Sequence, residues 1–83
     1  MKFFEAFKET VYRFDLKGSE LAELSGLTVS QISRFRQGQN IRIETLERLL
    51  AAMPPEAQEF MLLLVVHGDV AKGLLPKKSE EEP

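Results

Sequence analysis

The chain has 83 residues, enough for one domain with a thin core but not for two. It has no cysteine, which excludes disulfides and thiolate metal sites, and its longest apolar run, Phe60 to Val66, is too short to span a membrane. The net charge of −2 argues against nucleic-acid binding until its distribution is considered. Residues 28–42 hold three arginines and no acidic residue, so a segment of charge +3 interrupts a body of charge −5. Charge alone does not separate an anion-binding face from three scattered surface arginines.

The N-terminal segment has apolar residues at intervals of three and four, which predicts a helix over about residues 2–14. A short second helix is predicted over about residues 19–25, with Leu21 and Leu24 facing inward and Gly26 ending it. The inward face of the first helix would consist of Phe4, Phe7, Val11 and Phe14.

Three further helices are predicted. The third begins after Thr28, whose hydroxyl suits an N-cap, and ends near Gly38. The fourth covers about residues 43–53, and the fifth covers residues 54–67. The pair Pro54-Pro55 separates the two helices, and the second proline suits the first turn of the fifth. The apolar side of the fourth would consist of Ile43, Leu46, Leu49, Leu50 and Met53. Without strand-like alternation, the sequence predicts an all-α fold, a compact bundle of about five short helices.

Regular structure is not expected to continue far beyond the fifth helix, because Gly73 and Pro76 interrupt it. The domain is therefore predicted to cover residues 1–75, and residues 76–83 to form a disordered tail. Val70, Leu74 and Leu75 could still pack against the domain.

The segment over residues 18–37 is the most informative part of the chain. Ala22 is small enough for two helices to approach closely, Gly26 permits a sharp turn, and Ile32 can fill the space between the helices. This spacing is typical of a helix-turn-helix, although an ordinary helical hairpin needs the same small residues. Leu21, Leu27 and Phe35 would seal the pair.

The run LAELSGLTVSQISRFRQG, followed by TLERLLAAM, resembles the Cro/cI-type family of helix-turn-helix regulators, also called the xenobiotic-response-element (XRE) family. The resemblance covers about residues 16–53 and agrees in order, spacing and closing glycines. It implies a lambda-repressor-like domain that binds operator sites in double-stranded DNA, usually as a two-fold homodimer. It also implies a cytoplasmic regulator of bacterial, phage or plasmid origin, and repression of transcription.

The resemblance implies that the helix after Thr28 lies in the major groove. Arg34 is the strongest candidate, because its guanidinium can bond guanine O6 and N7 together, whereas Gln31 suits adenine and Val29 a thymine methyl. The candidate base contacts are Val29, Ser30, Gln31, Ser33 and Arg34. The candidate phosphate contacts are Gly18, Ser19, Thr28, Arg36, Gln39, Asn40 and Arg42.

Three positions depart from the family pattern. Gly18 stands where a phosphate-bracing glutamine is common, Gln39 where a lysine is usual, and Arg36 where an acid is usual. The backbone N–H groups at Gly18 could still contact a phosphate. The operator is therefore expected to differ from those of well-known relatives.

The fifth helix is apolar on all sides, which predicts burial on several sides. Either the first helix and the segment beyond the fifth cover it, or a second subunit does, and a homodimer is the favoured alternative. The candidate interface residues are Phe60, Leu63, Leu64 and Val66.

A rival prediction is a protein-interaction module, an antitoxin-like or adaptor subunit whose hydrophobic C-terminal helix binds a different protein, with DNA binding secondary or lost. A DNA-binding protein would keep Arg34, Arg36 and Arg42 exposed around the third helix, whereas an adaptor would bury or scatter them. Catalysis is not expected, because His67 beside Gly68-Asp69 makes neither a metal site nor a catalytic triad. No cofactor, metal or membrane is expected as a partner.

Overall fold

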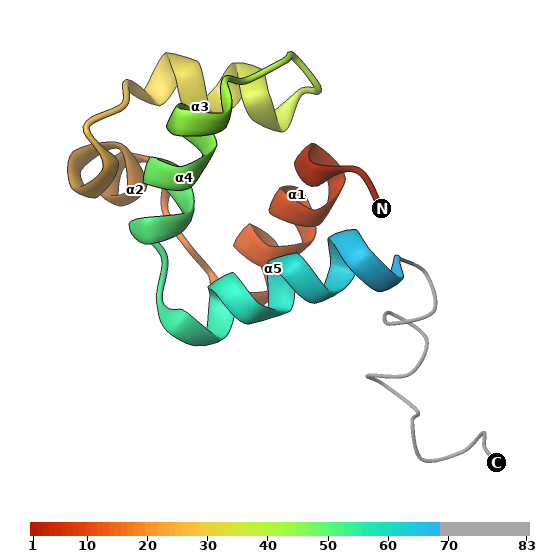
Figure 1. Ribbon diagram of the computed structural model, residues 1–83. Coiled ribbons are helices and arrows are strands. Elements are labelled where there is room, and N and C mark those ends of the chain that lie inside the picture. The colour runs from red at the N-terminus through yellow and green to blue at the C-terminus, as the bar shows by residue number, and fades with distance from the viewer. Residues whose placement is uncertain (69–83) are drawn as a thin grey trace, which may run out of the picture.

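The computed structural model describes residues 1–68, and over this range the chain forms five α-helices without strands (Figure 1). They are α1 (Phe3–Phe14), α2 (Gly18–Ser25), α3 (Val29–Arg36), α4 (Ile43–Ala51) and α5 (Pro55–His67). The predicted all-α fold is therefore confirmed, with helix boundaries within two residues of those expected. The predicted tail over residues 76–83, and Val70, Leu74 and Leu75, lie outside the described residues.

The five helices form two groups. The first and last helices, α1 and α5, lie side by side and run in opposite directions, and the N-terminal amine of Met1 donates a hydrogen bond to the carbonyl of Val65 at 3.4 Å (Figure 1). The remaining helices form the other group, in which α2 packs against both α3 and α4. Because α1 also contacts α3, the N-terminal helix joins the two groups. This arrangement leaves α3 at the edge of the molecule, with one face open to solvent.

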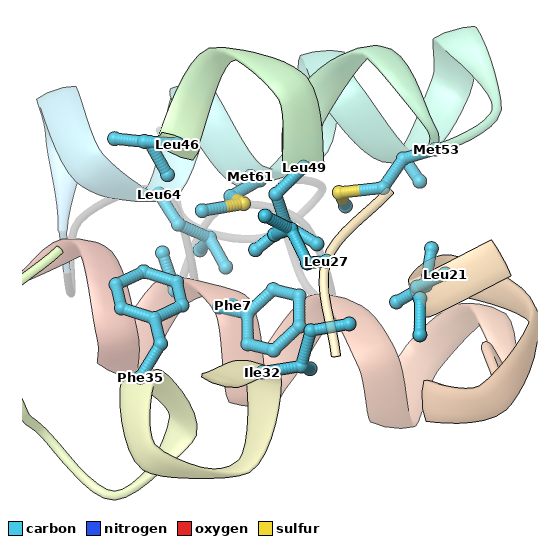
Figure 2. Close-up of a cluster of buried hydrophobic side chains, with 13 residues drawn as sticks. Phe7, Leu21, Leu27, Ile32, Phe35, Leu46, Leu49, Met53, Met61 and Leu64 are labelled. Carbon is cyan, nitrogen blue, oxygen red and sulfur yellow. The ribbon is translucent and has the colours of Figure 1, made fainter. Parts of the chain in front are cut away.

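The hydrophobic core is centred on Phe7, which is fully buried and points from α1 toward residues of α3, α4 and α5 (Figure 2). Its ring lies 5.3 Å from the ring of Phe35, measured between centroids, so α3 is attached directly to the centre of the core. The other large members of the core are Leu21, Leu27, Ile32, Leu46, Leu49, Met53, Met61 and Leu64. Every helix therefore contributes at least one side chain to a single core.

The connection between α2 and α3 has the predicted geometry. Ala22 is buried, and Gly26 has a φ of +79°, a left-handed conformation that suits glycine best. A Cβ added at Gly26 would lie 3.0 Å from Nη2 of Arg48, the mobile end of an exposed side chain, so the left-handed backbone and not the available space is what favours glycine here. Ser25 fixes the turn further, because its buried hydroxyl accepts a hydrogen bond from the backbone N–H of Leu27 at 3.2 Å.

Two residues that the sequence placed in the core lie on the surface instead. Leu24 is 71% exposed, because the buried side of α2 is centred among Leu21, Ala22 and Ser25, and at 3.6 residues per turn Leu24 lies roughly 100° around the helix from that centre. Ile43 is also exposed, since it occupies the first position of α4, before the helix reaches the core.

The segment between α4 and α5 shows a further difference from prediction. The fourth helix ends at Ala51 rather than continuing to Met53. Met53 is nevertheless buried, and its carbonyl accepts a hydrogen bond from Nε2 of Gln58 at 2.9 Å. The turn rather than the helix therefore positions this core residue, and Pro55 begins α5 as predicted.

The surroundings of α5 correct part of the predicted interface. Leu64 is 0% exposed and packs inside the chain's own core, so it offers no surface to a second subunit. Phe60 is half-buried between the ring of Phe14, 5.7 Å away, and the guanidinium of Arg13, 5.0 Å above its ring. The first helix thus covers one side of α5, whereas Leu62, Leu63 and Val66 remain exposed. Within residues 1–68 no helix is long and apolar enough to span a membrane.

Candidate nucleic-acid interface

The N-terminus of α3 is capped by a reciprocal pair of hydrogen bonds. The backbone N–H of Gln31 donates to Oγ1 of Thr28 at 3.0 Å, and the backbone N–H of Thr28 donates to Oε1 of Gln31 at 2.9 Å. This arrangement is a capping box, which is typical of a helix that begins at a fixed residue. It confirms Thr28 as the N-cap and gives Gln31 a structural role in addition to its predicted contact with a base.

The predicted base-contact residues all lie on the solvent-exposed surface of α3, and Ile32 and Phe35 anchor its opposite side in the core. On the exposed side, Nη1 of Arg34 donates a hydrogen bond to Oγ of Ser30 at 3.2 Å, one turn away. This bond directs the guanidinium back along the exposed side of α3 toward its first turn. The exposed predicted residues are Val29, Ser30, Gln31, Ser33 and Arg34.

A shallow hollow with a volume of about 220 Å³ lies between α3 and the loop that leads to α4. It brings together two predicted base contacts and three predicted phosphate contacts from different parts of the sequence. No acidic residue lines it, so its charge comes from two arginines. The lining residues are Gln31, Arg34, Phe35, Gln39, Asn40, Ile41, Arg42 and Thr45.

The other predicted phosphate contacts lie apart from this hollow. Arg36 is exposed on the last turn of α3 but does not line the hollow. Gly18 and Ser19 are the first two residues of α2, so neither is the N-cap, which is Lys17. Gly18 is half-buried, and no atom lies within 4 Å of a Cβ added there.

Sequence reasoning missed two features of this surface. Thr45 lines the hollow from the first turn of α4, and a lone threonine inside a predicted helix carries no signal for such a position. The capping role of Gln31 could have been found, because Thr28-x-x-Gln31 fits the capping-box pattern.

The described part of the chain holds no group of three or more His, Cys, Asp or Glu side chains that could bind a metal ion. His67 is exposed at the end of α5.

Comparison with known proteins gives one match. The family model described as "Helix-turn-helix", of the XRE type, matches residues 13–54, which is 42 of the 83 residues. The match begins in the last turn of α1, includes α2, α3 and α4, and ends before α5. No curated protein and no solved structure matches the chain.

Proposed function

The chain belongs to the XRE-type helix-turn-helix family of DNA-binding regulators, and we propose that it is a repressor that binds a palindromic operator as a homodimer. In this proposal α3 lies in the major groove, with Val29, Ser30, Gln31, Ser33 and Arg34 toward the base edges. Occupation of an operator by itself blocks other proteins from the same DNA. Repression is therefore the regulatory outcome that requires no contact between this protein and a second protein.

The hollow beside α3 is the observation that carries this proposal. Arg34 and Arg42 line it together although they lie on different elements, and Gln39 and Asn40 of the connecting loop line it as well. Arg34 can contact a base edge, and the polar residues Gln39 and Asn40 of the loop can contact the adjacent phosphates, so the hollow fits a surface that binds both parts of the DNA. Thr28 and Arg36, on α3, and Gly18 and Ser19, at the start of α2, are the remaining proposed phosphate contacts.

The exposure of the arginines supports this proposal over its rival. An antitoxin-like or adaptor subunit has no need to keep basic side chains accessible around α3. Arg34, Arg36 and Arg42 are all exposed, and no acidic residue occurs between positions 28 and 42. Such a local positive field attracts the phosphate backbone even though the whole chain is negatively charged.

Selection of bound sequences from random double-stranded DNA tests the proposed function. We expect a two-fold symmetric motif whose half-sites are separated by one helical turn, about 34 Å, because the symmetry of a dimer is repeated in its operator. Failure of the protein to enrich any sequence would refute operator binding. Enrichment of a single, unrepeated half-site would refute the symmetric dimer only.

We propose that the dimer forms through the exposed side of α5. Leu62, Leu63 and Val66 lie within five consecutive residues and leave three aliphatic side chains in contact with water. Burial of such a cluster against its two-fold copy is favourable, because removal of apolar surface from water stabilises an interface. Phe60, which α1 covers in part, would lie at the margin of this contact.

We expect Val66→Asp to convert a dimer into a folded monomer. Val66 is 74% exposed, so the substitution should change the stability of the subunit itself by only about 0.5 kcal/mol or less. In a dimer the same carboxylate would be buried without a partner, which is strongly unfavourable. Light scattering without DNA, together with a thermal melt, measures both effects.

Leu24→Asp is the matched control, because Leu24 is a similarly exposed aliphatic residue on α2. It should leave the oligomeric state unchanged. If the unmodified protein is already a monomer at tens of micromolar concentration, dimerisation through α5 is excluded. The exposed side of α5 would then be open to a different protein.

A further inference from the structure

The capping box at α3 restricts what Gln31 can offer to DNA. An unrestrained glutamine reads adenine with both ends of its carboxamide, since the oxygen accepts from N6 and the nitrogen donates to N7. In this structure the oxygen is held 2.9 Å from the backbone nitrogen of Thr28. Only a carboxamide oxygen can occupy that place, because the backbone group opposite it is a donor. The oxygen therefore faces the helix terminus, and the NH₂ group is the end available to a ligand.

The neighbouring side chains reinforce this donor character. Arg34 lies one turn after Gln31, lines the same hollow, and carries a guanidinium that can only donate. The hydroxyl oxygens of Thr28 and Ser30 each already accept one hydrogen bond, from Gln31 and Arg34 respectively. No carboxylate occurs on α3. The first two turns of α3 thus present donors from both of their long polar side chains.

We propose that Gln31 is a specificity-determining residue that selects guanine, and not adenine, at the base it faces. This inference rests on the proposed function, because it concerns the operator that α3 would read. Guanine presents two adjacent acceptors in the major groove, O6 and N7, which together can accept both hydrogens of the NH₂ group, whereas adenine offers N7 beside an amino donor, thymine offers O4 beside a methyl, and cytosine offers an amino donor only. An outward NH₂ group bonds the guanine edge without releasing the cap. Arg34 lines the same hollow, so each half-site would carry a second guanine for its guanidinium.

The test compares sequences selected from random DNA by the unmodified protein and by Gln31→Glu. Glutamate also forms a capping box with threonine, so the fold and the helix start should be retained, which a thermal melt checks. One carboxylate oxygen would replace the carboxamide oxygen in the cap, and the other would face outward as an acceptor. We expect one position per half-site to change from guanine to cytosine, whose amino group donates to a carboxylate.

Binding measurements on the two resulting sites quantify the change. The ratio of affinities for the guanine and cytosine sites removes the general repulsion between an added carboxylate and DNA. We expect this ratio to fall by about tenfold or more in Gln31→Glu. Gln31→Met, which keeps the backbone N–H bonded to Thr28 but offers no outward donor, should lose the preference at that position without gaining another.

The outcomes separate this inference from the proposed function. If the unmodified protein enriches no sequence, the proposed function itself is refuted. If it enriches a sequence with adenine at the position that responds to Gln31 substitution, or if no position responds, the operator-binding function stands and the role of Gln31 is refuted. Retention of the guanine preference by Gln31→Met would likewise refute the role of Gln31 and leave the operator-binding function standing.

Discussion

Phe7→Ala should destabilise the domain by about 3–5 kcal/mol, the usual cost of removing a buried phenylalanine from a core. Phe7 is fully buried and lies where α1, α3, α4 and α5 meet, so few atoms can move to fill the cavity. Domains of this size have a total free energy of unfolding of roughly 4–12 kcal/mol. The substitution should therefore unfold a substantial fraction of the protein near physiological temperature, as a thermal melt followed by circular dichroism will measure.

The matched control for this prediction is Tyr12→Ala on the same helix. Tyr12 is 86% exposed, so its loss should change the free energy of unfolding by about 0.5 kcal/mol or less. Similar melting temperatures for the two variants would contradict the central position of Phe7. DNA binding should fall with Phe7→Ala as well, because the contact between the rings of Phe7 and Phe35 holds α3 in place.

Arg34→Ala should reduce the free energy of binding to the preferred operator by about 1–3 kcal/mol and relax the sequence preference at one position in each half-site. The guanidinium is exposed on α3 and bonds Ser30, one turn nearer the N-terminus of that helix, so in the proposed complex it faces the groove. Binding isotherms on the preferred site and on single-base variants will measure this change. An equal loss on preferred and random DNA would instead assign Arg34 to a phosphate.

Arg42→Ala provides the comparison, because Arg42 lines the same hollow from the N-cap of α4 rather than from α3. As a proposed phosphate contact, its loss should weaken binding to all DNA and reduce the slope of log affinity against log salt concentration by about one unit. A sequence-selective effect of Arg42→Ala would instead assign Arg42 to a base edge.

Local sequence chemistry determined the order of the helices and the family. Thr28, Gly26 and Pro55 act on their own backbones, through a side-chain cap, a left-handed conformation and a fixed φ, so their effects are visible without a tertiary structure. The spacing of Ala22, Gly26 and Ile32 likewise predicted the helix-turn-helix, and the family match confirms it.

Only the tertiary structure decided which apolar side chains are buried. Apolar residues at helical spacing predict which side of a helix is buried. On a helix as short as α2 the few apolar residues are compatible with more than one buried side, and Leu24 was assigned to the wrong side. In α5 every position after Phe60 is apolar until His67, so periodicity gives no direction at all. Because α1 packs against one side of α5, Leu64 is buried in the core and Val66 remains on the surface.

The candidate interface divides in the same way. The exposed residues of α3 were predictable, because Ile32 and Phe35, three residues apart, mark the buried side of one short helix and the other residues fall outside it. The hollow shared by Arg34 and Arg42 depends on the path of the loop between α3 and α4, which residue types alone do not specify. The direction of the Gln31 carboxamide, by contrast, is set by a local hydrogen bond to the backbone N–H of Thr28, which the Thr28-x-x-Gln31 pattern could have predicted.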